Sequence, residues 1–387
     1  MAIDPHWDNV LLCLVATHSG LIDVSKFKNP VYLRSGVANN FVNHNTLVPK
    51  LVDAPANMIS IGRKAVLLPV LDGSIAAGRS IHTRLPEALG TGNLTIECWV
   101  RPTVSGGTTA SNQFGRIITI GTHLGNGNLN IIRNSVDNPF QARCELANSG
   151  SFHAITGTSG APNDTPAHLA LVRESGNWKW FINGVLISTT SLQGGLSLGL
   201  LDFNMGCIYV YTSPWNAFNG HVSGVRVTKN VARYSASFTS PLRQFSKSDA
   251  SFAGHIDESL AATEFVATLI DAATNLIHDQ VTVNTEISPD FTLNYFGEDR
   301  YYVTVVPTNA KKWAPSTIYA LNAQVIPDNP IATPYYYKRL SAGTSGTTEP
   351  TWPTTPGGRC NDGAVTDAWE LVERLSQPIT HGPLTPT

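Results

Sequence analysis

Residues that could break or form covalent bonds are scarce in this chain. A glycosidase built on a β-sandwich places two carboxylates about 5 to 10 Å apart across the scissile bond, yet the strand-like run 94–101 offers only Glu97. We expect Glu97 to face solvent or to pair with Arg101 on the same face of the strand. A nucleophile elbow needs a strand-to-helix turn, and the Gly- and Ser-containing loops 157–160 and 343–346 lack that context. The sequence therefore predicts a protein that is not an enzyme.

The histidines and cysteines that could bind a metal ion are also dispersed along the chain. The eleven histidines are scattered along the chain, whereas histidines that bind a transition metal have short, regular spacing. The five cysteines are odd in number and widely spaced, without a Cys-x-x-Cys pair, so we expect buried free thiols. They are Cys13, Cys98, Cys144, Cys207 and Cys360. The residues themselves predict no cofactor.

Aromatic side chains are the remaining candidates for ligand recognition. Sugars present faces of C–H groups that stack on indole and phenol rings, while their hydroxyls need polar partners beside the ring. Trp352 lies in a loop rich in proline, glycine and threonine, and Tyr336 and Tyr337 precede it in the chain. Tyr211 and Trp215 lie in a loop of the first domain. These five residues are the predicted carbohydrate-binding residues.

The same aromatics have a structural alternative. Side chains alternate between the faces of a strand, so Tyr335 and Tyr337 share one face and Tyr336 points to the other. One of these faces is expected to be core. For Trp352, a core position and a sugar-stacking surface are about equally favoured. The alternative for the loop with Tyr211 and Trp215 is that it only connects neighbouring strands. The expected core of the last module is Trp313, Tyr319 and Trp369.

Period-two alternation dominates the first two-thirds of the chain and predicts β-strands. In the run 94–101, Trp99 stands on the second face, so we expect a mid-sheet strand covered on both sides. Asn183-Gly184 is typical of a type I′ hairpin turn, which predicts a three-stranded meander over 168–190. One short helical turn is expected at 231–236. The predicted fold class is all-β, an antiparallel jelly-roll sandwich followed by two small β modules.

Changes in composition predict the domain boundaries. Residues 1–246 form the large sandwich, and a polar linker follows. Residues 250–308 read as a small immunoglobulin-like β-sandwich, with strand-like runs at 264–270, 280–284, 290–295 and 300–306. Residues 311–376 form a small aromatic-rich module, and residues 377–387 form an extended tail.

Charge and hydropathy exclude several classes of partner. Only 14% of the residues are charged, and 26 basic residues stand against 28 acidic ones, so no electrostatic signature for nucleic acid is present. The longest apolar runs fall short of the ~20 residues that cross a bilayer. Residues 1–9 lack the pattern of a secretory signal peptide. We expect no nucleic-acid partner and no membrane insertion.

Three segments of the first domain resemble the laminin-G-like, concanavalin A-type lectin fold. They are 93–102, 168–184 and 218–227, and their order and spacing match the family. Members that bind calcium often carry an acidic pair where this chain has Ser223 and Gly224, and Asp23 is the acid nearest to a second frequent ligand position. Calcium is therefore possible but is not an expected cofactor.

Two further strings resemble virion proteins of tailed bacteriophages. The run Val231-Ala232-Arg233-Tyr234 through Pro241 is similar to the closing segment of laminin-G-like domains in phage tail and fibre proteins. The strings 342–346 (Ala-Gly-Thr-Ser-Gly) and 349–353 (Glu-Pro-Thr-Trp-Pro) resemble a module common in phage tails and distantly like chitin-binding-type carbohydrate modules. The middle segment is similar to small sandwiches of the carboxypeptidase-regulatory type.

These resemblances imply a non-enzymatic structural protein of the phage virion, in the tip, baseplate or fibre of the tail. Its lectin-like modules would contact host cell-surface polysaccharide, weakly per site and usefully through many copies. Other virion proteins and further copies of this chain are the implied partners, and assembly in the host cytoplasm is expected. One alternative is a capsid decoration or tail-assembly protein whose modules bind other virion proteins. Another is a bacterial surface adhesin, against which the missing signal peptide argues.

Overall fold

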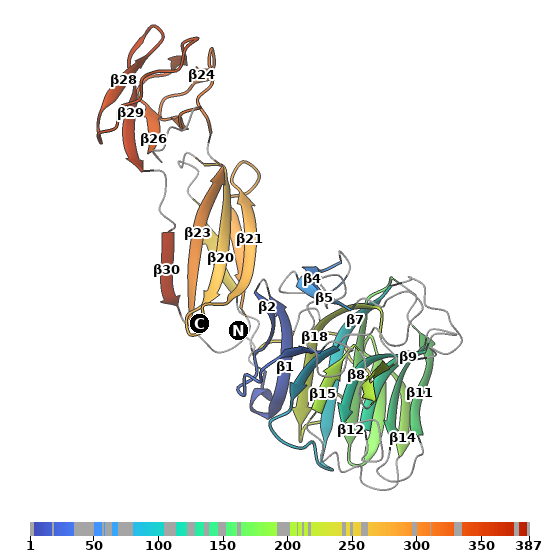
Figure 1. Cartoon of the computed structure of the whole chain (residues 1–387). Coiled ribbons are helices and arrows are strands. Elements are labelled where there is room, and N and C mark those ends of the chain that lie inside the picture. Colours follow the sequence, from blue (N-terminus) through green and yellow to red (C-terminus); the bar gives the residue numbers. More distant parts are fainter. Residues whose placement is uncertain are drawn as a thin grey trace. The chain divides into compact units, whose positions relative to one another are not determined.

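The chain is built almost wholly from β-strands, as the alternation predicts (Figure 1). It divides into two compact units, Met1–Asp249 and Ala250–Thr387. Among the described residues, no helix has the length and apolar character required to span a bilayer. The computed structural model describes residues 4–17, 19–34, 50–55, 58, 64–68, 80–103, 114–121, 128–134, 139–145, 152–160, 164–191, 202–206, 208–210, 213–215, 218–241, 245–247, 251–256, 262–295, 300–309, 311–328, 335–374 and 379–384.

The first unit contains a nine-stranded antiparallel sheet. Its strands are β1 (Val10–Thr17), β2 (Gly20–Asp23), β4 (Lys50–Asp53), β5 (Lys64–Leu68), β7 (Leu94–Pro102), β12 (Ala167–Glu174), β13 (Asn177–Ile182), β14 (Val185–Ser191) and β18 (Gly220–Lys229). They run in the order β14-β13-β12-β7-β18-β1-β2, with β5 beside β18 and β4 beside β5. The pairing of β12 with β13 and of β13 with β14 confirms the predicted meander and its Asn183-Gly184 turn.

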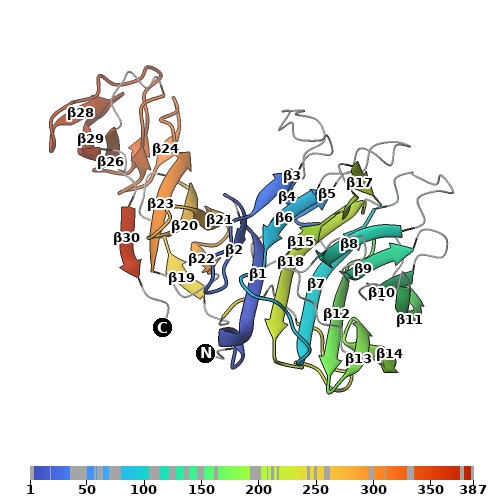
Figure 2. The ribbon, with the colours of Figure 1, turned by 60° about the horizontal axis from the view of Figure 1, so that its bottom comes forward.

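A seven-stranded antiparallel sheet forms the second layer (Figure 2). Its strands are β3 (Tyr32–Arg34), β6 (Ser80–Arg84), β8 (Phe114–Gly121), β9 (Asn128–Asn134), β10 (Pro139–Glu145), β11 (Phe152–Gly160) and β15 (Asp202–Met205). The order is β11-β10-β9-β8-β15-β6-β3. A short hairpin of β16 (Ile208–Val210) and β17 (Ser213–Trp215) lies outside both sheets. The two large sheets make the predicted jelly-roll sandwich.

The main hydrophobic core contains side chains from both sheets. Leu94, Ile96 and Cys98 of β7 are buried in it, and Trp178 and Trp180 of β13 join them. Since residues of one parity on each strand enter this core, residues of the other parity face outward. The side chains that could contact a ligand are therefore those on the two outer faces of the sandwich.

The second unit begins with a smaller sandwich. It comprises β19 (Ser251–His255), β20 (Glu264–Asp271), β21 (Ile277–Asn284), β22 (Asp290–Asn294), β23 (Tyr301–Asn309) and β30 (Ile379–Leu384). One sheet pairs β19 with β22, and the other has the order β21-β20-β23-β30. The four predicted strand runs are present, whereas β19 and β30 were not predicted. Residues 377–387, expected as an extended tail, contain the extended strand β30, which is paired with β23.

The remaining residues of the second unit form a module with its own core. Its strands are β24 (Ile318–Tyr319), β25 (Gln324–Val325), β26 (Tyr335–Arg339), β27 (Gly343–Thr344), β28 (Arg359–Asp362) and β29 (Val365–Arg374). Trp313 and Trp369 are buried in this core and Tyr319 packs against it, which confirms the prediction. Because the strands are short and the aliphatic residues few, aromatic rings supply most of the packing.

Candidate functional site

Glu97 is fully buried on the outer face of the nine-stranded sheet, so the expectation that it faces solvent or pairs with Arg101 is wrong. Its carboxylate accepts a hydrogen bond from Nε of Arg226 at 2.9 Å. The same carboxylate accepts the hydroxyl of Tyr234 at 2.8 Å and lies 3.1 Å from Nε2 of His168. Burial alone would raise the pKa of Glu97, but Arg226 and His168 together hold that pKa at about 2. Glu97 is therefore a buried, ionised carboxylate that neighbouring side chains stabilise through hydrogen bonds and charge.

The described residues of the closing segment, 231–241, cover this face together with Phe245. The rings of Tyr234 and Phe238 stack with centroids 3.6 Å apart, and Phe238 packs edge-on against Phe181 of β13. Phe245 lies under the guanidinium of Arg226, 4.4 Å from it. Around Glu97 the segment therefore occupies the outer face of the nine-stranded sheet that a ligand would otherwise contact.

The prediction of a helical turn at 231–236 is wrong. Side chains form hydrogen bonds with backbone groups that a helix would pair with one another. The hydroxyl of Thr95 donates to the carbonyl of Val231 at 3.0 Å. The hydroxyl oxygen of Thr95 also accepts a hydrogen bond from the backbone amide of Arg233 at 3.0 Å. The Arg233 side chain in turn lies 2.9 Å from the carboxylate of Asp4. Side-chain hydrogen bonds of this kind compete directly with helix formation.

The outer face of the seven-stranded sheet carries a continuous line of polar residues, here called the polar row. Its members stand directly opposite one another across five adjacent strands, and cross-strand partners share a face. Their chain neighbours Ile81, Phe203 and Leu129 enter the core, so the row faces away from it. The polar row consists of Tyr32, His82, Asn204, Thr119 and Asn130.

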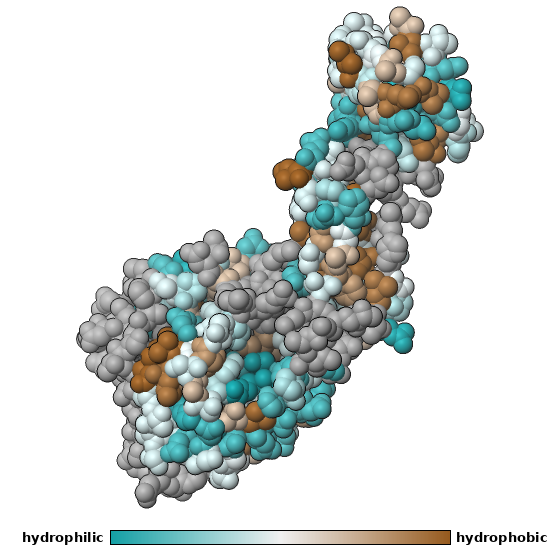
Figure 3. Space-filling view, turned by 180° about the vertical axis from the view of Figure 1, so that it is seen from behind, coloured by the Kyte–Doolittle hydropathy of each residue, from teal (hydrophilic) through white to brown (hydrophobic). Residues whose placement is uncertain are grey.

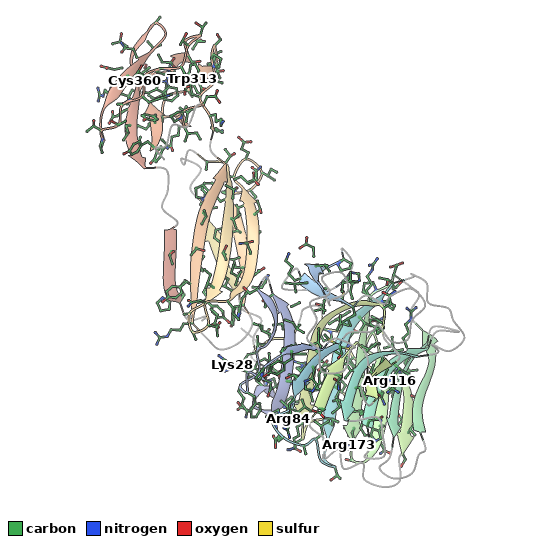
Figure 4. The ribbon with its side chains drawn as sticks, viewed as in Figure 1. Lys28, Arg84, Arg116, Arg173, Trp313 and Cys360 are labelled. Carbon is green, nitrogen blue, oxygen red and sulfur yellow. The ribbon has the colours of Figure 1, made fainter. Side chains whose placement is uncertain are left out.

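A buried hydrogen-bond network fixes one end of the polar row. The amide oxygen of Asn130 accepts bonds from Thr119 Oγ1 at 2.9 Å and from Arg116 Nη1. The amide nitrogen of Asn130 donates to Asn128. Asn204, in the middle of the row, is buried, and its Oδ1 accepts no hydrogen bond from any described residue. Figure 4 labels Arg116, which extends from β8 of this sheet.

The other end of the polar row is accessible. Tyr32 is 56% exposed, and Arg84, two residues after His82 on β6, is also exposed. The side chain of Asp202 is 44% exposed and lies 3.4 Å from Nε2 of His82. A phenol ring, an imidazole, a carboxylate and a guanidinium thus gather on one face. This combination suits a ligand with many hydroxyls, which needs both donors and acceptors beside a ring.

The described residues do not supply a metal centre. Within the described ranges, no three His, Cys, Asp or Glu side chains come together to hold an ion. Asp23, the acid nearest to the family's calcium position, uses both carboxylate oxygens locally. It accepts the amides of Cys13, Ser25 and Asn29 at 2.8 to 3.0 Å. These bonds shape the loop after β2.

Tyr337 and Trp352 lie together, with Tyr337 inside the module and Trp352 only partly buried. Their ring centroids are 4.3 Å apart, Tyr337 is 1% exposed and its hydroxyl donates to the carbonyl of Pro353. Trp352 is partly buried, and its indole N–H donates to Glu349 at 2.9 Å. Tyr337 therefore has no free face for a sugar, whereas Trp352 keeps part of its ring at the surface.

The other predicted residues are placed elsewhere. Tyr336 lies on the opposite face of β26 from Tyr337, partly buried, as the alternation predicted. It is therefore not brought together with Trp352. Trp215 ends β17, with its side chain outside the described residues, and Tyr211 lies outside them altogether. Figure 3 shows hydrophobic and hydrophilic residues side by side on the visible face of the module.

The strings 342–346 and 349–353 form hydrogen bonds that hold loops of the module in place. One of these bonds goes to Asp362. Asp362 accepts hydrogen bonds from the indoles of Trp313 and Trp369 and from Arg339, at 3.2, 2.8 and 2.7 Å. The amide of Gly346 completes the set at 2.8 Å. Although burial opposes ionisation, these donors lower the pKa of Asp362. The glycines of 342–346 and the acid of 349–353 thus serve local architecture.

Sequence reasoning missed the polar row, although a signal for it exists. Asn128-Leu129-Asn130-Ile131 and Asp202-Phe203-Asn204-Met205 alternate polar and apolar residues with period two. A run Gly195-Leu196-Ser197-Leu198-Gly199 also has nucleophile-elbow spacing and lies outside the described residues.

Comparisons with known proteins agree with this architecture. Residues 43–233 match the family model Laminin_G_3, described as the concanavalin A-like lectin/glucanases superfamily. The first unit thus contains a concanavalin A-like lectin/glucanase domain. No curated protein matches the chain.

Several solved structures are similar to the chain at low identity. One is domain 4 of the extracellular arabinanase AbnA from Geobacillus stearothermophilus, in complex with arabinotriose, with 16% identity, 58% of this chain and 94% of that chain covered, and a TM-score of 0.41. Another is CBM40 of the Ruminococcus gnavus IT-sialidase bound to alpha2,3 sialyllactose, with 13% identity, coverage of 38% and 80%, and a TM-score of 0.33. A third is the binding domain of Paraclostridial Mosquitocidal Protein 1, with 11% identity, coverage of 89% and 75%, and a TM-score of 0.42.

Proposed function

We propose that this protein, whose first unit contains a concanavalin A-like lectin/glucanase domain, binds glycans through the polar row and breaks no bond. One observation carries the proposal. Of the two outer faces of the sandwich, the closing segment packs over the buried Glu97 cluster on one, while the other carries the polar row with an accessible end. Hydroxyl-rich ligands pair with such fixed donors and acceptors, and Tyr32 supplies a ring for their apolar faces.

Absence of catalysis is part of the proposal. Retaining and inverting glycosidases need two carboxyl groups on either side of the bond. On the accessible end of the polar row Asp202 is the acid that the structure describes, and Glu97 is buried on the other sheet. We expect incubation with a bound oligosaccharide to release no shorter sugar.

We further propose that the protein belongs to the virion of a tailed phage, in the tail tip, baseplate or fibre. The supporting observation is the sequence resemblance of the closing segment and of the strings 342–346 and 349–353. Host surface polysaccharide is the proposed ligand, and many copies on one particle would multiply a weak single-site affinity.

Two measurements test these statements. The full chain is titrated by calorimetry against host lipopolysaccharide, capsular polysaccharide and chitin-type oligosaccharides, and saturable binding to at least one is expected. Gold-labelled antibody on purified particles, with quantitative mass spectrometry to count the copies, is expected to place the chain on the tail. Hundreds of copies on the head, without glycan binding, would instead establish a capsid decoration protein.

A further inference from the structure

Asn204, in the middle of the polar row, has a side-chain amide whose oxygen lacks a hydrogen-bond donor. The residue is 5% exposed, and its Oδ1 is buried without accepting a hydrogen bond from any described residue. Its chain neighbours Phe203 and Met205 enter the core of the sandwich, so Asn204 points to the outer face of the seven-stranded sheet. A buried acceptor without a donor is rare in native proteins and needs a physical explanation.

The side chains on either side of Asn204 make contacts with other groups. Thr119 stands opposite Asn204 on β8, and its hydroxyl donates to Oδ1 of Asn130 at 2.9 Å. His82 stands opposite Asn204 on β6, and its Nε2 lies 3.4 Å from the carboxylate of Asp202. Neither contact supplies the donor that Oδ1 of Asn204 lacks. A bound ligand is therefore a suitable source of that donor.

Exposure increases from Asn204 towards the accessible end of the polar row. The side chains of His82 and Asp202 are 14% and 44% exposed, and Tyr32 is 56% exposed. By contrast, Nδ1 of His168 is also buried without a partner, but His168 packs under Phe238 of the closing segment. Asn204 thus combines an unpartnered acceptor with neighbouring side chains that reach solvent.

The chemistry of a primary amide indicates which ligand group fits. One planar group offers an oxygen acceptor and an N–H donor side by side. Two hydroxyls on adjacent carbons of a sugar ring match this pair, because one can donate to the oxygen while the other accepts from the nitrogen. Rotating the amide by half a turn exchanges its oxygen and nitrogen, but the same pairing with two hydroxyls remains available.

We propose that Asn204 determines the specificity of the polar row by pairing with a vicinal diol, which is two free hydroxyls on adjacent carbons of a sugar ring. This inference rests on the proposed function, because it concerns the same site, and it names the class of glycan that the site takes. A site built to hydrogen-bond a hydroxyl strongly rejects an analogue that lacks it, since buried polar groups are then left unpaired.

Oxidation of the polysaccharide tests the diol directly. Periodate cleaves the bond between two carbons that carry adjacent hydroxyls, and borohydride then reduces the resulting aldehydes to alcohols. Host lipopolysaccharide and capsular polysaccharide are titrated by calorimetry before and after this treatment, with borohydride alone as the control. The wild-type chain is expected to bind the oxidised form at least ten-fold more weakly. Unchanged affinity would overturn the inference and leave glycan binding by the polar row intact.

Two other results with the wild-type chain are also decisive. Binding to chitin-type oligosaccharides alone would contradict the inference, because their internal sugars have no two adjacent free hydroxyls. Absence of binding to every polysaccharide would refute the proposed function itself, and this inference with it.

Asn204→Leu tests the residue, with Asn177→Leu at an exposed position of β13 as the matched control. Asn204→Leu is expected to bind the native polysaccharide at least ten-fold more weakly and to lose the discrimination against the oxidised form, whereas Asn177→Leu keeps both. Because leucine leaves no unpaired acceptor, Asn204→Leu is also expected to melt at the wild-type temperature or above it. Retained discrimination would overturn the inference. So would a lower melting temperature, because Asn204 would then be satisfied within the protein, for example by an ordered water.

Discussion

At the scale of single residues, two buried carboxylates each gather several hydrogen-bond donors in the interior of this protein. Glu97 gathers Arg226, His168 and Tyr234 in the first unit, and Asp362 gathers two indoles and Arg339 in the last module. Each acid is stable in the interior because several donors replace the water that it has lost. Removing such an acid leaves the donors unsatisfied, so the local fold is the property at risk.

Glu97→Gln is expected to lower the free energy of unfolding of the first unit by about 3 to 5 kcal/mol, since an arginine is left buried beside a neutral group. Glu87→Gln is the matched control, because Glu87 forms an exposed ion pair with Lys229. Exposed pairs contribute about 1 kcal/mol or less. Urea unfolding followed by tryptophan fluorescence measures both variants. Similar decreases in the free energy of unfolding for the two variants would show that the buried cluster contributes no more to stability than an exposed ion pair.

The pKa of Glu97 predicts how the first unit responds to acid. Its ordinary pKa is 4.5 and its folded pKa is about 2, so below pH 4.5 the unfolded chain binds more protons than the folded chain. The stabilisation is therefore complete above about pH 4.5 and is lost as the pH falls towards 2. Thermal unfolding between pH 2 and 6 is expected to show a shallower pH dependence in Glu97→Gln than in the wild type. Parallel curves for the two proteins would contradict this assignment.

At the scale of elements, period-two alternation and turn chemistry predicted the strand at 94–101, the meander and four strands of the smaller sandwich, because both signals are local. The meander at 168–190 and the runs at 264–270 and 300–306 were found this way. Burial of Glu97 could not be read from its own strand, since the covering residues lie more than 130 positions away in the chain. The strand β30 was missed because a short segment with glycine and proline becomes a strand only when an existing edge accepts it.

The structure does not bring the described members of the predicted carbohydrate-binding set together on one surface, for a related reason. Sequence inspection favours large aromatic rings, yet Tyr337 was needed for a core that has few aliphatic residues. The polar row lies on five strands whose order in the sheet is not their order in the chain. Each strand shows a polar face in its sequence, but only the sheet topology places these faces in one line.

Gly184 is expected to be essential for seating the closing segment. A Cβ atom at Gly184 would lie 2.0 Å from the carbonyl oxygen of Phe238, whereas one at Gly176 would meet nothing within 4 Å. Both glycines have positive φ, at +77° and +83°, so alanine strains both backbones similarly. Gly184→Ala is expected to speed amide exchange in residues 231–241 well beyond Gly176→Ala. Equal exchange in the two variants would mean that the contact with Phe238 is unimportant.

At the scale of the whole molecule, the chain consists of two compact units. In the first unit, the amide of Asp4 donates to the carbonyl of Lys247 at 2.7 Å, so its two ends meet. The carboxylate of Asp4 also binds Arg226 and Arg233. Asp4 thus ties the two ends of the first unit together, and we predict that this unit unfolds separately from the second.

Calorimetry on the full chain is expected to show two unfolding transitions. Deleting residues 1–6 removes Asp4 from the cluster of Arg226 and Arg233, so it should lower the melting temperature of the first unit and leave the other transition in place. A chain of residues 1–249 should reproduce the transition of the first unit. A single transition, shifted as a whole by the deletion, would show that the units unfold together.

The most direct test of the account is glycan binding by variants of the polar row. The polysaccharide that binds the wild-type chain is titrated against His82→Ala, Asn204→Ala and, as controls on the other unit, Tyr336→Ala and Trp352→Ala, with circular dichroism to verify folding. The account predicts at least ten-fold weaker binding for His82→Ala and Asn204→Ala and little change for the controls. Unchanged binding by the row variants, or a loss confined to Trp352→Ala, would place recognition elsewhere and contradict the central claim.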